Sequence, residues 1–251
     1  MRSARMRRVA RITGTTMMIA GVGAIGWALL VWQWQDPFTA IYTKYQQHKL
    51  AESFAHRFDD YRPAAPAPKV AKKKEKQKHE PEPEQNAAAS VAAAATAYRR
   101  SLHEGDPVGR LVVPRLGLKS IVVNGTSHDD LTRGPGREMH TAMPGEGELV
   151  YVAGHRTTYL APFAHIDSLR PGDRVEFVLP YATFEYEITG HRIVEADNLS
   201  VLRTHHREVL ALQACHPRFF ATHRYIAYAK PVRVIPRQGR PYAVGPRQPL
   251  A

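Results

Sequence analysis

The chain has very little cysteine: there is one among its 251 residues, Cys215. A lone cysteine cannot form a disulfide within its own chain, so no disulfide framework holds this fold together. Its presence has two explanations, a small buried apolar residue or a nucleophile. Without a second cysteine, the nearby histidines also lack the closed ligand set of a zinc site. We therefore expect neither a bound metal nor a cofactor.

The folded part of the chain lacks an excess of positive charge, although the formal net charge of the whole chain is +12. Residues 106–235 carry 15 Lys and Arg against 14 Asp and Glu, so the excess lies in the flanking segments. Recognition of nucleic acid requires a basic face on the domain itself. We therefore expect no nucleic-acid partner.

Long apolar runs are absent except for one, residues 12–34, which contains no charged residue. As a helix it would be roughly 34 Å long, enough to cross a hydrocarbon core of about 30 Å. Five arginines precede it in residues 1–11, which predicts a cytoplasmic N-terminus and an extracellular location for everything after residue 34. A cleaved signal peptide would have a shorter apolar region ending in small residues. We expect a single-pass anchor in the cell membrane.

The segments on either side of the main domain differ from it in composition. Residues 38–61 show apolar residues at helical spacing, which fits a short amphipathic helix near the membrane or a continuation of the anchor. Residues 62–97 consist almost wholly of Ala, Pro, Lys and Glu and predict an extended spacer, with only transient helix in 87–97. Residues 236–251 are rich in Pro, Gly and Arg and are expected to be disordered.

From about residue 106 to residue 235, short runs of β-branched and aromatic residues are separated by turn residues. About eight such runs occur, and several alternate apolar and polar residues in the manner of half-buried strands. They predict an all-β domain, either a closed β-barrel or a sandwich. Two short helical turns are expected, at 129–133 and 164–169.

Three residues that could cooperate in nucleophilic catalysis each stand at the end of a strand-like run: His155, Cys215 and Arg224. A thiol is only a few per cent ionised at neutral pH, and positive neighbours raise that fraction. Arginine can stabilise the thiolate or a developing oxyanion, and histidine can protonate a leaving amine and deprotonate its replacement. Each residue alone has a structural explanation, but together they predict acyl transfer through a thioester.

Two longer motifs surround these residues. They are Val152-Ala153-Gly154-His155-Arg156-Thr157-Thr158-Tyr159 and Leu212-x-x-Cys215-His216-Pro217-Arg218-Phe219. With eight residues between Cys215 and Arg224, this pattern resembles the sortase family, most closely the class E sortases of actinobacteria. The resemblance covers roughly residues 107–235, about half of the chain.

The resemblance implies a fold and a domain organisation. The fold is an eight-stranded sortase-type β-barrel with short helical turns, preceded by a transmembrane helix and a linker. The implied segments are a cytoplasmic basic arm (1–11), the anchor (12–34), a juxtamembrane segment and linker (35–105), the catalytic domain (106–235) and a disordered tail (236–251).

It also implies a membrane-anchored cysteine transpeptidase acting on secreted proteins that carry a C-terminal sorting signal. Such an enzyme cuts between Thr and Gly, holds the acyl group as a thioester, and passes it to an amine of a lipid-linked cell-wall precursor. By position, Cys215 is the nucleophile, His155 the general acid and base, and Arg224 the residue that orients substrate and stabilises the oxyanion.

Three further positions are implied to bind substrate: Tyr159, Thr157 and Ala214. Tyr159 stands where class E enzymes are associated with a preference for Leu-Ala-x-Thr-Gly over Leu-Pro-x-Thr-Gly signals. Ala214 departs from the family, which commonly has threonine before the cysteine, and this departure bears on substrate preference.

Several alternatives stay open or are disfavoured. A pilin-polymerising sortase would use a lysine of another pilin subunit as the amine, and a degenerate relative would bind without catalysis. An L,D-transpeptidase would have arginine two residues after the thiol, where this chain has Pro217. In a papain-like protease the cysteine precedes the histidine, which is the reverse of the order here.

Overall fold

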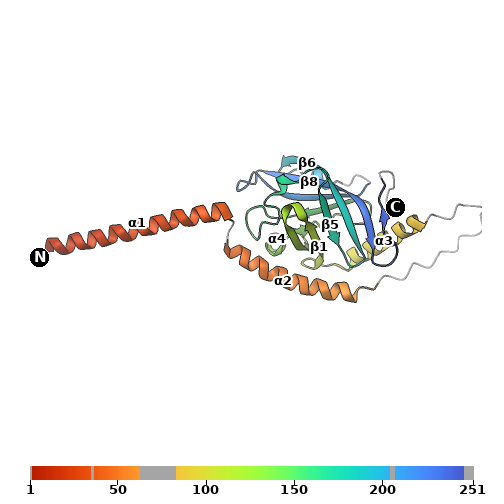
Figure 1. The fold of residues 1–251 in the computed structure, drawn as a ribbon, viewed down its shortest axis with the longest axis horizontal. Coiled ribbons are helices and arrows are strands. Elements are labelled where there is room, and N and C mark those ends of the chain that lie inside the picture. The colour runs from red at the N-terminus through yellow and green to blue at the C-terminus, as the bar shows by residue number, and fades with distance from the viewer. Residues whose placement is uncertain (1, 35–36, 63–82, 204–206, 246–251) are drawn as a thin grey trace, which may run out of the picture.

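The computed structural model describes residues 2–34, 37–62, 83–203 and 207–245 (Figure 1). Most of the expected spacer, residues 63–82, and the end of the expected tail lie outside the described residues.

The centre of the molecule is a β-barrel. Its strands are β1 (Pro107–Val113), β2 (Leu118–Asn124), β3 (Gly136–Arg137), β4 (Leu149–Ala153), β5 (Arg174–Val178), β6 (Ala182–Glu195), β7 (Val209–His216), β8 (His223–Pro236) and β9 (Tyr242–Ala243). The first eight lie in the order β6-β5-β1-β2-β3-β4-β7-β8, and β8 pairs again with β6, which closes the ring. The predicted eight-stranded barrel is confirmed, and β9 is added along the second half of β8.

The barrel closes around one hydrophobic core because its strands have the two-residue periodicity that sequence reasoning detected. Residues 182–188 of β6 alternate between buried and half-buried positions, as expected for a strand with one face inside. Phe177, Phe184 and Leu212 are fully buried in this core. Burial of each such side chain stabilises the fold by about 1.5–3 kcal/mol.

Two long helices, α1 and α2, come first along the chain. Helix α1 (Arg2–Trp34) contains a stretch, Met6–Leu29, that is long and apolar enough to cross a membrane, as expected for the anchor. Helix α2 (Pro37–Asp60) is a separate helix that lies along the barrel (Figure 1). Helix α2 contacts strand β2 and the short helix α4 (His128–Arg133). Helix α4 occupies the first of the two expected helical turns. A 3₁₀ helix, η2 (Ile166–Ser168), occupies the second.

The contact between α2 and the barrel is both apolar and polar. Leu50 and Phe54 of α2 are buried against Ile121 and Val123 of β2. The Gln47 amide donates to the carbonyl oxygens of Ile121 (2.9 Å) and Arg133 (2.8 Å) and accepts from the Ile121 N–H (2.7 Å). A side-chain amide that pairs with both groups of a strand backbone fixes the helix in one position on the barrel.

Residues 83–101 form a stable helix, α3 (Pro83–Ser101), where the sequence predicted an extended spacer with only transient helix. It is folded against the barrel, and Val91, Ala95 and Tyr98 are buried in the main core. The average composition of this segment does not reveal that its apolar residues lie on one face of a helix. One such face is sufficient to hold the helix on the barrel, which supplies the opposing apolar surface. The expected disordered tail differs in the same way, because β9 extends the sheet and Tyr242 is buried. The remaining short helices are η1 (Pro114–Leu116) and η3 (Leu199–Leu202).

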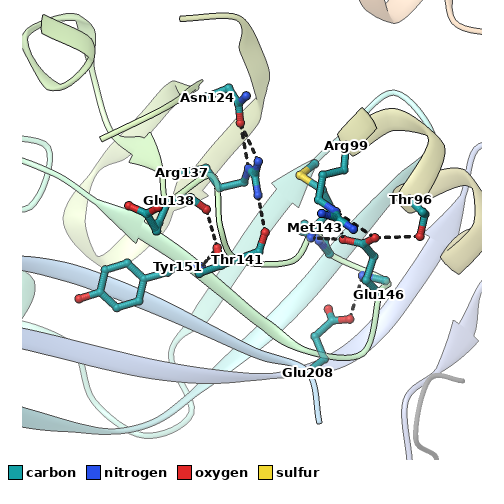
Figure 2. Close-up of polar contacts among 12 residues, drawn as sticks. Thr96, Arg99, Asn124, Arg137, Glu138, Thr141, Met143, Glu146, Tyr151 and Glu208 are labelled. Carbon is teal, nitrogen blue, oxygen red and sulfur yellow. Dashed lines mark hydrogen bonds and ion pairs between the residues drawn. The ribbon is translucent and has the colours of Figure 1, made fainter. Parts of the chain in front are cut away.

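A polar network fixes the connection between β3 and β4 and ties it to α3 (Figure 2). Arg137 is fully buried and donates to two neutral acceptors, Asn124 Oδ1 (2.8 Å) and the Thr141 carbonyl oxygen (2.6 Å). Burial, followed by the charge of Arg99, lowers the pKa of Arg137 to about 10, so it stays protonated at neutral pH. Glu146 accepts from Thr96 (2.8 Å) and pairs with Arg99 (2.9 Å), both on α3.

A buried carboxyl group stands beside this network. Glu208 accepts hydrogen bonds from the Tyr186 hydroxyl (2.6 Å) and the Gly145 N–H (2.8 Å). These bonds favour the ionised form, but burial outweighs them and raises the pKa of Glu208 to about 7. The folded protein therefore keeps a proton on Glu208 that the unfolded chain releases above its ordinary pKa of 4.5.

We expect Glu208→Gln to flatten the pH dependence of stability. In the native chain the contribution of Glu208 falls as pH rises from about 4.5 to about 7 and is constant above, at a total cost of up to about 3 kcal/mol. Glutamine resembles the protonated acid and does not titrate. The free energy of unfolding in urea should therefore rise in the variant relative to the parent chain as the pH increases from about 4.5 to about 7. Glu176→Gln on β5 is the control, because this side chain is only half-buried. Its difference in free energy of unfolding from the parent chain should stay the same across that pH interval. A Glu208→Gln variant that is less stable than the parent chain at pH 8 would contradict this account.

Candidate active site

The register between β7 and β8 places the cysteine and the arginine side by side. Cys215 and Arg224 are direct partners across this antiparallel pair, as are their neighbours Ala214 and Tyr225. Ala214 and Tyr225 are buried in the core, so Cys215 and Arg224 point to the outer face of the barrel, where both are half-buried. Directly opposed residues have Cβ atoms about 4.5–5.5 Å apart, which is within reach of a guanidinium.

The guanidinium of Arg224 is held by the loop that joins β7 to β8. Its Nη1 donates to the carbonyl oxygens of Ala221 (2.8 Å) and His223 (3.0 Å). Both bonds use one nitrogen, whereas a guanidinium has five N–H donors in a planar fork. The side chain is thus positioned by the loop and keeps donors for an oxygen of a bound substrate.

The histidine reaches the same end of the barrel along a third strand. Strand β4 runs parallel to β7, with Ala153 opposite Gln213, and the Gly154 N–H donates to the Gln213 carbonyl oxygen (2.9 Å). Both strands therefore end together, with His155 just beyond β4. Gly154 permits a close turn, because a Cβ added there would lie 2.7 Å from the ring of Phe163.

The environment of His155 favours its neutral form. The ring lies 5.0 Å from the ring of Tyr159 and 6.5 Å from the ring of His128. Burial, followed by the charge of His128, lowers the pKa of His155 below its ordinary value. Its Nε2 atom is buried and has no hydrogen-bond partner among the described residues. A buried ring nitrogen without a partner is uncommon, and it is suited to exchange a proton with a thiol or a substrate.

His128 was not expected from the sequence, and its effect on His155 can be measured. It is exposed at the start of α4. We expect His128→Gln to raise the pKa of His155, because it removes a like charge that disfavours the protonated ring. The titration of the His155 ring proton by NMR measures the shift. His140→Gln, which removes an exposed histidine from the β3–β4 connection, should not move it, and an unchanged or lower pKa in His128→Gln would contradict the assignment.

The loop after β4 carries the expected substrate-binding residues Thr157 and Tyr159, both half-buried. Tyr159, Leu160 and Ala161 have φ angles of 53°, 61° and 38°, a strained conformation for residues with a Cβ. Such strain persists only where the surroundings impose it, and it is often found at binding sites. One constraint is a hydrogen bond from the Tyr159 N–H to Thr39 Oγ1 of α2 (3.1 Å).

The structure thus brings five of the six expected site residues to one end of the barrel surface, and the sixth lies beneath them. Ala214 has no exposed surface, because the alternation of β7 turns it into the core. In this position it packs under Cys215 and does not line the outer face.

Sequence reasoning missed Arg156, which connects the histidine loop to the cysteine. The side chain is only 3% exposed. It donates to the Cys215 carbonyl oxygen (3.3 Å), lies 3.0 Å from His216 Nδ1 and pairs with Asp167 (2.7 Å). Its place directly after His155 was the only signal in the sequence, because arginine is ordinarily exposed and its burial depends on the loop conformation.

A hollow away from these residues lies between α3 and the C-terminal segment. It is lined in part by Val91, Tyr181 and Tyr242. It also contacts Pro236, the last residue of β8, whereas Arg224 is near the first, so this hollow is remote from the cysteine. The candidate active site is therefore the outer face beside Cys215, at the end of the barrel that also carries Arg224 and His155.

Comparison with known proteins finds sortases among the similar proteins. The Sortase domain model matches residues 111–232. Sortase D of Bacillus subtilis is 34% identical over 132 residues, which cover 51% of this chain and 65% of that protein. The chain therefore spans less than two thirds of the length of that curated relative.

Two solved structures are also similar. The Sortase D5 transpeptidase of Clostridium perfringens has a TM-score of 0.56 at 23% identity, covering 75% of this chain and 99% of that chain. Sortase E1 from Streptomyces coelicolor, solved with a tripeptide in its active site, has a TM-score of 0.50 at 27% identity. The match covers 53% of this chain and 92% of that chain. Sortases named D and E are both among the matches, so the comparisons do not distinguish between these classes.

Proposed function

We propose that this chain, whose barrel matches the Sortase domain model and is similar to Sortase D of Bacillus subtilis, is a membrane-anchored cysteine transpeptidase of the sortase family. The proposed reaction cleaves a C-terminal sorting signal between Thr and Gly and transfers the acyl group to an amine of a cell-wall precursor. The observation that carries the proposal is the direct pairing of Cys215 with Arg224 at the barrel end where His155 has a buried Nε2 without a hydrogen-bond partner in the part of the chain that the structure describes.

In the first half of the reaction, the Cys215 sulfur attacks the threonine carbonyl carbon. Neutral His155 accepts the thiol proton, and the donors of Arg224 stabilise the oxygen as it gains charge. The carbon–nitrogen bond then breaks, and the His155 imidazolium gives its proton to the departing glycine amine. The product is a thioester between threonine and Cys215.

In the second half, an incoming amine attacks the thioester carbon. His155 removes a proton from this amine, the carbon–sulfur bond breaks, and the proton returns to the Cys215 sulfur. The net change exchanges one amine for another, so no oxidant, metal or cofactor is required. Tyr159 and Thr157 are proposed to contact the signal beside the scissile bond, with Tyr159 favouring Leu-Ala-x-Thr-Gly.

The proposed topology follows from α1 and the charges before it. The arginines of the first eleven residues favour a cytoplasmic N-terminus and a barrel outside the cell. Sorting-signal proteins and lipid-linked cell-wall precursors would meet the enzyme there. Sortase E1 binds a tripeptide in its active site, which supports a peptide as the first substrate here as well.

Intact-mass spectrometry of the full chain in detergent tests the proposal. The chain is incubated with Leu-Ala-x-Thr-Gly and Leu-Pro-x-Thr-Gly peptides, with and without hydroxylamine as a probe amine. We expect a mass increase on Cys215 equal to the acyl fragment, lost again when hydroxylamine is added. A folded chain whose thiol reacts with a labelling reagent but takes up neither acyl group would contradict the proposal and favour a domain that binds without catalysis.

A further inference from the structure

A short series of contacts connects the apolar stretch of α1 to the active site. Trp27 lies within this stretch, and its ring is 5.7 Å from the ring of Phe38, the second residue of α2. The next residue, Thr39, accepts a hydrogen bond from the backbone of Tyr159 (3.1 Å), and the Tyr159 ring lies 5.0 Å from His155. If α1 spans the bilayer, the loop that carries His155 is therefore at the membrane surface.

Helix α2 holds this arrangement rigidly. Besides the Gln47 and Leu50 contacts, the Thr43 hydroxyl is buried and donates to the Thr132 carbonyl oxygen (2.7 Å) of α4. Only residues 35 and 36 separate the end of α1 from the start of α2. Figure 1 shows α1 leaving the N-terminal end of α2 and pointing away from the barrel. The docked helix therefore determines which end of the barrel is nearest the membrane.

Exposed apolar side chains are concentrated at this end. The first three turns of α2 carry four of them on one face: Phe38, Ile41, Tyr42 and Tyr45. At 100° per residue they span about 100° of the helix, on the side away from Thr43 and Leu50, which face the barrel. Phe38 and Ile41 are each 70% exposed. Their spacing is that of a stripe made to contact an apolar surface.

The loops around the active site add three more. Leu160 is 41% exposed and follows Tyr159, while Phe219 and Phe220 are 55% and 77% exposed in the loop that joins β7 to β8. Isolated exposed apolar residues are ordinary, but a group at one end of a molecule marks a surface of contact. Tyrosine is also suited to the membrane–water interface, because its ring is apolar and its hydroxyl can be hydrated, while phenylalanine and leucine contribute apolar area only.

We propose that these seven residues form an apolar collar that rests on the outer leaflet of the bilayer, so that the active site opens at the level of the lipid headgroups. The collar consists of Phe38, Ile41, Tyr42, Tyr45, Leu160, Phe219 and Phe220. The inference rests on the proposed anchoring by α1. Its consequence is a preference for substrates that are themselves held at the membrane surface, because they are presented at the height of the thiol without leaving the bilayer.

The position of the collar can be measured with a fluorophore. Cys215→Ala removes the only cysteine, and a new one is introduced by Leu160→Cys or, at the far end of the barrel, by Arg240→Cys, which is exposed. Each full chain, labelled with bimane, is placed in vesicles of phosphatidylcholine and phosphatidylglycerol with or without brominated acyl chains. We expect strong quenching of the label at 160 and none at 240. Equal quenching at both positions, or none at 160 in chains that float with the vesicles, would overturn the proposal.

A functional measurement separates the collar from catalysis. We expect the double variant Ile41→Ser/Tyr45→Ser to act on a soluble signal peptide at the parental rate. On the same peptide tethered to a lipid, we expect its rate to fall about tenfold, equivalent to about 1.4 kcal/mol of lost apolar contact. Met139→Ser, which removes an exposed apolar residue of the β3–β4 connection, is the matched control and should change neither rate.

The outcomes distinguish this inference from the proposed function. Unchanged rates of the double variant on both substrates would refute the collar while leaving the transpeptidase proposal intact. Failure of the parent chain on the soluble peptide would refute the proposed chemistry. Failure of the full chain to float with vesicles would refute the anchoring and the collar together.

Discussion

The Cys215→Ala variant is expected to form no acyl adduct and to transfer no sorting peptide, while its barrel stays folded. Alanine has no nucleophilic atom, and the remaining His155 and Arg224 cannot form the thioester, so we expect a loss of at least about 10⁴-fold. The fold should tolerate the change because Cys215 points to the outer face and is only half-buried. Intact-mass spectrometry measures the adduct, and circular dichroism during thermal unfolding measures the fold.

A matched substitution on the same strand serves as the control. Gln213→Ala, two residues earlier on the same outer face of β7, should retain the adduct. Undiminished transfer by Cys215→Ala would show that the thiol is not the nucleophile. Unfolding of that variant would instead assign Cys215 to the structure of the barrel.

Arg156→Met is expected to have the second largest effect, on stability and on the rate of acylation. The substitution leaves the Cys215 carbonyl oxygen and the Asp167 carboxylate without the guanidinium that now binds them. Removing a buried member of an ion pair costs about 3–5 kcal/mol, but Asp167 is half exposed, so we expect about 2–3 kcal/mol. Urea unfolding measures this loss.

The rate of acylation separates positioning from stability in this variant. Arg156 holds both the backbone of Cys215 and the loop that bears His155, so its loss should displace the two reacting groups relative to each other. After correction for the folded fraction, we expect acylation to slow by roughly tenfold to a hundredfold. Arg156→Lys should recover part of the stability through its charge, but little of the rate, because it lacks the planar fork.

Arg115→Met is the control for this experiment. Arg115 is also paired with a carboxylate, Asp173, but its side chain is 42% exposed, so its loss should cost less than about 1 kcal/mol. Its acylation rate should equal that of the parent chain. If Arg156→Met loses stability yet acylates normally when folded, the side chain supports the loop without positioning the reaction.

Several features of the molecule could be predicted from local sequence patterns. Alternating residues along β6 and apolar runs such as Leu149–Ala153 predicted strands, because side chains on a strand alternate between its two faces. The apolar stretch in α1 was evident for a similar reason, since length and lack of charge are sufficient to identify it. His155, Cys215 and Arg224 were found because each follows or begins such a run.

Features that depend on distant surfaces were not predicted. The Ala-rich segment appeared too polar and too poor in large apolar residues to fold, yet α3 packs into the core because the barrel offers a matching surface to Val91 and Ala95. Tyr242 in the expected tail is buried through its pairing with β8. The buried position of Arg156 was equally hidden, because its partners, Cys215 and Asp167, are distant in the sequence.

The candidate chemistry and the barrel strands of this protein could be predicted from its amino-acid sequence, since the identity of a reactive side chain and the periodicity of a strand are local properties. The arrangement of the site depends on the tertiary fold. Only the register of β7 against β8 turns Cys215 outward beside Arg224 while Ala214 turns inward. Only the docking of α2 brings Thr39 to Tyr159. A one-residue change in register would reverse the faces of every residue on β7, and no local pattern around Cys215 specifies that register.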